Sequence, residues 1–170
     1  VNLNSGLILG ADDAYEKADR ILWNALAFNQ WISGGFGSRG TTRNGYGTHG
    51  IEEAWWCCLH NGGLAFVEYA QHAVTLRDRA VCVNLLLPGR YALTLADGRE
   101  VEVEIGTEYP AAAATVVEAR GVPEDVMLKL RVPDSVSAPE VSEARTGDTV
   151  RISLPGRIGH RIEDCDPGVM

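Results

Sequence analysis

The residues of this chain best suited to chemistry are two adjacent cysteines, Cys57 and Cys58. They stand in the segment Glu-Glu-Ala-Trp-Trp-Cys-Cys-Leu-His-Asn-Gly, just after a glycine-rich stretch. A thiol acts as a nucleophile or a metal ligand in its thiolate form, which a helix N-terminus or a bound zinc ion favours. The alternative is that both thiols are buried, since a free cysteine usually packs as a small hydrophobic side chain. The local sequence leaves both interpretations open.

Histidine, acidic and aromatic residues surround the pair. His49 and His60 could complete a zinc site with the two cysteines, although their spacing matches no standard zinc finger. Otherwise they are surface groups placed where a sugar could contact them. Glu52 and Glu53 could serve as an acid or as ligands, or could be solvated charges at the start of a helix. Trp56 is predicted to line a cleft and to offer a flat face to a sugar ring.

The composition excludes several classes of protein. The 170 residues, 45% hydrophobic and 22% charged, fit one large folded domain or two small ones. A net charge of −8 argues against a nucleic acid or an anionic membrane as partner. No apolar stretch approaches the roughly 20 residues that span a bilayer. The four cysteines are irregularly spaced and the start of the chain shows no export signal, so we expect a reducing, cytoplasmic location.

The spacing of apolar residues changes near residue 79. One helix is predicted from Asp12 or Asp13 to about Asn29, buried on most sides, and a second from about Gly63 to Arg77, with Asn61 as its cap. The apolar stripe of the first helix consists of Tyr15, Ala18, Leu22 and Leu26, and Ile21, Ala25 and Phe28 make this stripe wider. Residues 33–50, with seven glycines, form either a functional loop or a flexible connector.

From residue 80 onward the apolar residues alternate, which predicts strands. The alternation is clearest at Val81–Leu87, Tyr91–Leu95, Val101–Ile105, Val126–Val132 and Val150–Leu154, with a turn at Asp97-Gly98. Short strands separated by proline and glycine predict an antiparallel β-sandwich. We therefore expect a helical domain over residues 1–79 and a sandwich over 80–170. Because two helices cannot close a core, further helices of the same protein or a partner subunit should cover them.

Six segments of this chain, in order, resemble motifs of glycoside hydrolase family 127, the β-L-arabinofuranosidase-like enzymes. Residues 15–26 (YEKADRILWNAL) resemble the family's "YADxxERxLYNAxL" helix, with Asp19 where the family usually has Glu. Cys57-Cys58 followed by Asn61 resembles "CCPPN". Residues 81–86 resemble "LYVNLY", 108–110 "TxYPW", 128–133 "LxLRIP" and 147–155 "GDxVxLxLPM". The series covers nearly the whole chain.

The resemblance implies a fold of mixed α and β class, in which the last helices of an (α/α)6 barrel precede an antiparallel β-sandwich. It also implies a zinc cofactor, with Cys57 as both nucleophile and zinc ligand and Cys58 as a second ligand. The substrate would be a carbohydrate, an L-arabinofuranoside or related glycan, and we expect Asp19, His49, Trp56 and His60 to contact it.

The family takes its other two zinc ligands from a Glu-x-Cys motif and its acid/base glutamate from a Gly-Glu segment. Both lie earlier in the family's barrel than the helix matched here, so the matched series supplies half of a site. Retaining glycoside hydrolysis requires an acid as well as a nucleophile. The second hypothesis is therefore a non-catalytic module that binds carbohydrate or a partner barrel through its sandwich. A third is a redox or metal-sensing module that uses the adjacent thiols.

Overall fold

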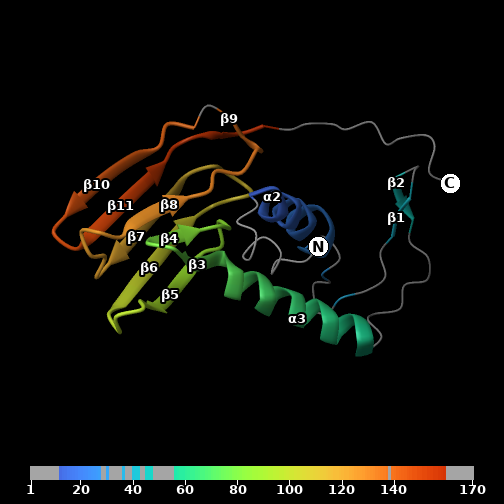
Figure 1. Ribbon diagram of the computed structural model, residues 1–170. Coiled ribbons are helices and arrows are strands. Elements are labelled where there is room, and N and C mark those ends of the chain that lie inside the picture. The colour runs from blue at the N-terminus through green and yellow to red at the C-terminus, as the bar shows by residue number, and fades with distance from the viewer. Residues whose placement is uncertain are drawn as a thin grey trace.

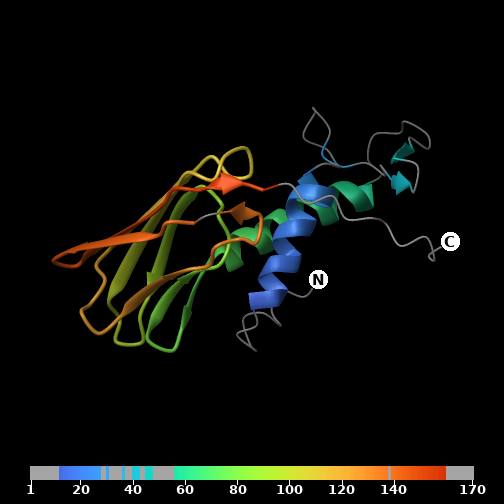
Figure 2. The same ribbon diagram turned by 90° about the horizontal axis from the view of Figure 1, so that it is seen from above.

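The computed structural model describes residues 12–27, 30, 36, 40–42, 45–47, 56–137 and 139–159 (Figure 1). Two helices lie at one end of a β-sandwich (Figure 2). Helix α2 (Asp12–Ile21) continues as the π-helical turn η1 (Leu22–Leu26), and α3 (Trp56–Ala73) leads directly into the first strand of the sandwich. Neither helix combines the length and the apolar character that crossing a bilayer requires.

The sandwich is built from a five-stranded and a three-stranded sheet. The larger sheet is antiparallel, and its strands follow the order β10 (Ser142–Thr146), β11 (Thr149–Leu154), β7 (Thr115–Arg120), β6 (Glu100–Thr107) and β5 (Gly89–Thr94). The smaller sheet has the order β3 (Val74–Arg77), β4 (Ala80–Val83) and β8 (Met127–Leu130). Two strand pairs lie outside these sheets, β1 (Gly40–Thr42) with β2 (Gly45–Gly47) and β9 (Val136–Ser137) with β12 (Arg157–Ile158).

The alternating residues form strands as predicted, because each strand of the large sheet buries one face. On β6, Val101, Val103 and Ile105 are at most 2% exposed, while Glu100 and Glu102, which alternate with them, face solvent. The predicted turn forms between β5 and β6, where Gly98 adopts a φ of 85° that favours glycine. The prediction of a sandwich is therefore confirmed for these strands.

One pairing differs from the all-antiparallel prediction. Strands β4 and β8 run parallel, with Ala80 beside Met127 and Val83 beside Leu130. Parallel neighbours require a long crossover connection, and here β5, β6 and β7 of the other sheet supply it. As a consequence, the residues that follow β4 and β8 meet at the same edge of the small sheet.

The helical predictions need two corrections at the ends and one on burial. Helix α3 begins at Trp56 rather than near Gly63, and it ends at Ala73, because Val74–Arg77 forms strand β3. The sandwich thus begins before the expected boundary at residue 79. Helix α2 is also not buried on most sides, since Ile21 is 40% exposed and Ala25 is exposed.

Two glycines explain why the start of α3 was predicted at the wrong residue. Gly62 and Gly63 lie inside the helix, where glycine normally costs about 1 kcal/mol relative to alanine. A Cβ at Gly62 would overlap the ring of Phe36, which is buried and lies 5.6 Å from the ring of Phe66. Close packing of Phe36 on the helix therefore requires glycine at this position.

A single hydrophobic core joins the helices to the sandwich. Tyr15, Ala18 and Leu22 on α2 are each at most 2% exposed and belong to the same cluster as the inner residues of both sheets. The hydroxyl of Tyr69 on α3 donates a hydrogen bond of 2.9 Å to the carbonyl of Ala18, which ties the two helices together. The stripe of apolar residues predicted for α2 is thus confirmed on the side that faces the sandwich.

Candidate functional site

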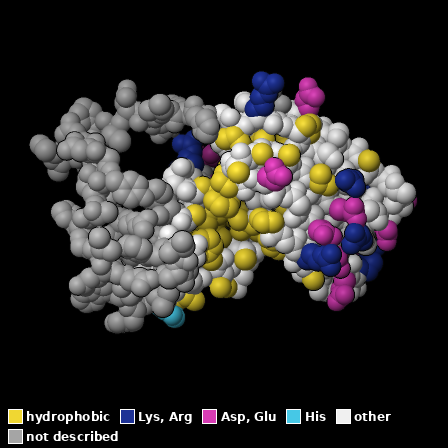
Figure 3. Space-filling model, turned by 180° about the vertical axis from the view of Figure 1, so that it is seen from behind, with side chains coloured by type: hydrophobic (Ala, Val, Ile, Leu, Met, Phe, Trp, Pro, Cys, Tyr) yellow, Lys and Arg dark blue, Asp and Glu magenta, His cyan; other side chains and the backbone are white. Residues whose placement is uncertain are grey.

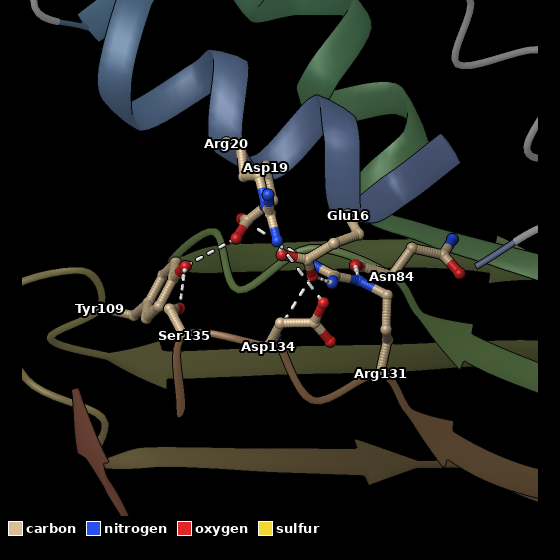
Figure 4. Close-up of polar contacts among 8 residues, drawn as sticks. All are labelled: Glu16, Asp19, Arg20, Asn84, Tyr109, Arg131, Asp134 and Ser135. Carbon is tan, nitrogen blue, oxygen red and sulfur yellow. Dashed lines mark hydrogen bonds and ion pairs between the residues drawn. The ribbon is translucent and has the colours of Figure 1, made fainter. Parts of the chain in front are cut away.

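Beside its apolar stripe, α2 carries polar side chains that contact the sandwich at a buried junction (Figure 4). Glu16, Asp19 and Arg20 lie three and four residues apart, so they share one face of the helix. Asp19 is 3% exposed. Its Oδ2 accepts a hydrogen bond of 2.6 Å from the hydroxyl of Tyr109, which also shares a hydrogen bond of 2.9 Å with the hydroxyl of Ser135.

Arg131 connects this helix face to the small sheet. Its Nη1 lies 2.7 Å from Oε2 of Glu16, and its Nη2 lies 3.7 Å from Oδ1 of Asp19. Its Nε donates to the carbonyl of Asn84, whose side-chain amide donates in turn to the carbonyl of His72. Arg131 follows β8 and Asn84 follows β4, so the parallel pairing of these strands brings the two residues together.

Burial decides the protonation behaviour of this junction. Burial raises the pKa of the Asp19 carboxyl, while the hydrogen bond from Tyr109 and the charge of Arg131 oppose that increase. Burial also raises the pKa of Tyr109, and its hydrogen bond to Asp19 raises it further. Burial raises the pKa of Tyr69 to about 12. Both tyrosines therefore keep their protons at neutral pH and act as hydrogen-bond donors.

A hollow of about 650 Å³ lies against the junction. Besides Glu16, Asp19 and Tyr109, it is lined by residues of η1, β9 and β12 and their neighbours, including Trp23, Asn24, Pro110, Ser137 and Ile158. The ring of Trp23 meets the ring of Tyr109 edge to face, with centroids 5.9 Å apart. The arrangement can bind and orient a polar group. It holds no activated nucleophile, because the partners of the Ser135 hydroxyl include no base among the described residues.

The structure places the backbone of the cysteine pair in the first turn of α3. Helix α3 begins at Trp56, so Cys57 and Cys58 follow directly at its N-terminal end. The side chains of these three residues, and the whole of His49, Glu52 and Glu53, lie outside the described part of the chain. His60 is described and is exposed. Within the described ranges, no three His, Cys, Asp or Glu side chains are grouped so that they could hold a metal ion.

The structure thus describes two of the six predicted site residues with their side chains, Asp19 and His60. It brings Asp19 together with Glu16, Tyr109 and Arg131, none of which the sequence analysis singled out. A signal for them was present, because Glu16, Tyr109 and Arg131 each belong to one of the matched motifs. Three motifs far apart in the sequence meet at this junction.

Comparison with known proteins supports the fold. No protein family model matches this chain, and no curated protein matches it by sequence. Among solved structures, a GH127 β-arabinofuranosidase superposes with a TM-score of 0.66 at 18% identity, covering 89% of this chain and 30% of that one. A second structure, described as a glycoside hydrolase, superposes with a TM-score of 0.64 at 18% identity over 85% of this chain and 29% of its own.

A third similar structure is a GH127 β-L-arabinofuranosidase from Geobacillus stearothermophilus T6, at 19% identity over 63% of this chain and 21% of that one. Its TM-score of 0.45 is too low to establish a common fold. The resemblance found in the motifs is confirmed as a likeness of fold. This chain spans less than a third of the length of each of these proteins. The described residues include two helices and the sandwich, and they show no closed (α/α)6 barrel.

Proposed function

We propose that this chain is part of a retaining glycoside hydrolase that acts on L-arabinofuranosides or related glycans, with Cys57 as its nucleophile. The observation that carries the proposal is the meeting of three family-like motifs at one buried junction, within a fold shared with a GH127 enzyme. The junction holds α2 against the sandwich. We therefore assign Asp19 a positioning role, since the sandwich residues Tyr109 and Arg131 contact its carboxylate.

The chemistry would proceed in two displacements at the anomeric carbon. The thiolate of Cys57 would attack that carbon while the glycosidic C–O bond breaks and the leaving oxygen takes a proton from a general acid. Water would then displace the sulfur while it gives a proton to the conjugate base of that acid, which releases the sugar with retained configuration and restores the thiolate. The position of Cys57 in the first turn of α3 supports this role, because the positive end of a helix dipole favours a thiolate.

A zinc ion, when bound, would hold the cysteines as thiolates at neutral pH. Cys57 and Cys58 suit zinc by their chemistry and would supply two of the ligands it requires. The chain also contains one Glu-x-Cys tripeptide, Glu163-Asp164-Cys165. This tripeptide follows the sandwich instead of preceding the helix, and it lies outside the described residues. Glu163 and Cys165 are candidates for the missing ligands.

We also propose that further helices cover the outer faces of α2 and α3. Ile21 on α2 is 40% exposed, and Leu64 and Val67 on α3 are 52% exposed. Figure 3 shows hydrophobic side chains gathered beside the helical end of the molecule, whereas charged side chains gather at the far end of the sandwich. Apolar faces of this kind usually mark an interaction surface. Further helices of the same protein or a partner subunit would bury them.

The alternative function is a non-catalytic module whose sandwich binds carbohydrate. The outer face of the large sheet argues against this use of the sandwich. Ion pairs cover it, including Arg90 with Glu104 and Arg120 with Glu102 and Glu118. A sugar-binding sheet face usually offers aromatic rings, and the exposed described residues of β5, β6 and β7 include none.

A cytoplasmic location stays a prediction.

The first test is zinc per chain by elemental analysis. We expect near-stoichiometric zinc in the wild type and in the control variant Cys82→Ser, whose cysteine is buried on β4, and none in Cys57→Ser/Cys58→Ser. Loss of zinc in Cys165→Ser would assign the tripeptide as the other half of the site. Equal zinc content in all variants would refute the assignment of the pair as ligands.

The second test is hydrolysis of p-nitrophenyl β-L-arabinofuranoside by the protein as its gene encodes it. We expect Cys57→Ala to abolish turnover and Cys82→Ala to retain it. Intact mass spectrometry of the wild type during turnover should show a glycosyl adduct on Cys57. Turnover that survives Cys57→Ala would exclude this residue as the nucleophile.

A further inference from the structure

The hollow beside the junction has no role in the proposed function. It lies between η1 and the short strands β9 and β12, and its volume of about 650 Å³ is typical of a small-molecule site. Helix α3 begins at its end farthest from the sandwich (Figures 1 and 2), whereas the described lining of this hollow comes from α2, η1 and the sandwich. We call it the junction hollow.

Its walls combine flat apolar surface with hydrogen-bonding groups. Trp23, Tyr109, Pro110 and Ile158 provide rings and hydrocarbon, and Asn24 and Ser137 provide amide and hydroxyl groups. A sugar presents the same combination, since its C–H faces pack on aromatic rings while its hydroxyls donate and accept hydrogen bonds.

The charge of the lining selects among polar ligands. Glu16, Asp19 and Asp134 carry carboxylates, and the guanidinium of Arg20 lies 3.2 Å from Glu16 and 3.7 Å from Asp134. Arg131 also pairs with Glu16 and Asp19, so three carboxylates and two guanidinium groups leave this group net acidic by one charge, which disfavours phosphorylated or carboxylated ligands. Carboxylates are strong acceptors for the hydroxyls of an uncharged sugar.

One buried group in the lining has hydrogen-bonding capacity left. The side chain of Asp19 is 4% exposed, and its Oδ1 accepts no hydrogen bond, although Nη2 of Arg131 forms an ion pair with it at 3.7 Å. The buried indole N–H of Trp23 also lines the hollow, and its interaction with the Asp19 carboxyl lowers the pKa of that group. Buried polar atoms normally find a partner, and those that do not often mark a site.

We propose that the junction hollow binds an uncharged sugar, as a carbohydrate site separate from the cysteine pair. The second described hollow, lined by residues of β6, β7 and β11, lacks aromatic residues and suits a sugar less well. The proposal does not depend on hydrolysis. A sugar would bind at the junction hollow whether or not Cys57 is a nucleophile.

The test uses L-arabinotriose as the probe and isothermal titration calorimetry as the readout, on the 170-residue chain. Ser137 lines the junction hollow and Ser142 lines the second hollow, and both are exposed strand residues. We expect Ser137→Trp to fill the junction hollow and to weaken binding at least about tenfold, which corresponds to about 1.4 kcal/mol. Ser142→Trp, the matched control, should bind as the wild type does. Circular dichroism should confirm that both variants fold.

Four outcomes would overturn the proposal. The first is the absence of binding to wild type up to the solubility of the trisaccharide, and the second is equal affinity in Ser137→Trp and wild type. The third is a loss in Ser142→Trp alone, which would place the sugar in the second hollow. Cys57→Ser/Cys58→Ser separates this proposal from the proposed function. We expect it to bind the trisaccharide as wild type does, whereas loss of binding, the fourth outcome, would place the sugar at the cysteine pair.

Discussion

Replacing Arg131 by methionine should destabilise the protein more than any comparable change of a surface arginine. The Arg131 side chain is 10% exposed, and those of its acidic neighbours Glu16 and Asp19 are 16% and 4% exposed. Methionine fills similar space but leaves both carboxylates without this counter-charge, and the carbonyl of Asn84 loses its donor. Removing one partner of a buried ion pair typically costs about 3–5 kcal/mol, because the other charge stays buried.

The contacts that remain place the expected loss at the lower end of that range. Glu16 keeps its ion pair with Arg20 at 3.2 Å, and Asp19 keeps the hydrogen bond from Tyr109. We therefore expect the free energy of unfolding to fall by about 3 kcal/mol at pH 7. The free energy of unfolding of a domain is roughly 5–15 kcal/mol in total. The expected loss is therefore a large part of it, and urea unfolding followed by circular dichroism can measure it.

The loss should also depend on pH. Arg131 lowers the pKa of Asp19 against the effect of burial, so the variant raises that pKa further. The loss is full at pH values above the pKa of Asp19 in the folded variant. It shrinks as the pH falls through that pKa, because a protonated carboxyl needs no counter-charge.

Arg145→Met is the matched control for this experiment. Arg145 donates to the carbonyls of Val122 and Val126, and no described carboxylate pairs with it. We expect Arg145→Met to lower the free energy of unfolding by about 1 kcal/mol, and this loss should not change with pH. An equal loss in the two variants, or a loss in Arg131→Met that persists unchanged at acid pH, would refute the argument that a buried charge is left uncompensated.

Three further predictions test the junction and the start of α3. Tyr109→Phe should cost about 2 kcal/mol in urea unfolding, since it removes a hydrogen bond to a charged, buried carboxylate, and a loss below about 0.5 kcal/mol would contradict this. In the wild type, the raised pKa of Asp19 means that its contribution to stability is full below the unfolded value of 3.8 and is lost as the pH rises through the folded pKa. Asp19→Asn should therefore remove this part of the pH dependence of the free energy of unfolding, and an unchanged profile would show that another group causes it. Gly62→Ala should destabilise the protein by about 1–3 kcal/mol through overlap with Phe36, whereas Gly63→Ala, with open space around it, should stabilise it by about 0.5–1 kcal/mol. The melting temperatures of the two glycine variants should shift in opposite directions from that of the wild type. Shifts of the same sign would count against the packing explanation.

Local periodicity was sufficient to predict the strands of the large sheet. Val101, Val103 and Ile105 alternate with glutamates because one face of β6 is buried, and burial imposes a period of two on any such strand. The apolar stripe of α2 was predictable for the same kind of reason. Ile21 extends that stripe in the sequence, yet it is exposed, because the described neighbours of α2 cover only one side of the helix.

The start of α3 could not be predicted from local sequence. Glycine has a low helix propensity, so two glycines argue against a helix at this point. Only the packing of Phe36 on Gly62 explains why glycine is needed there. Likewise, the pairing of β4 with β8 depends on a crossover through the other sheet, which leaves no signal in either strand.

The sequence alone determined the alternation that makes the sandwich, the order of the motifs and the placement of two thiols near the start of a helix. Only the tertiary structure decided that Glu16, Asp19, Tyr109 and Arg131 form one buried junction. Glu16 and Arg131 are 115 residues apart in the chain. Periodicity reports which face of an element is buried, but the partner of a buried charge is set by how the elements pack. Packing is a property of the whole chain, so no local pattern of residues could have named these partners.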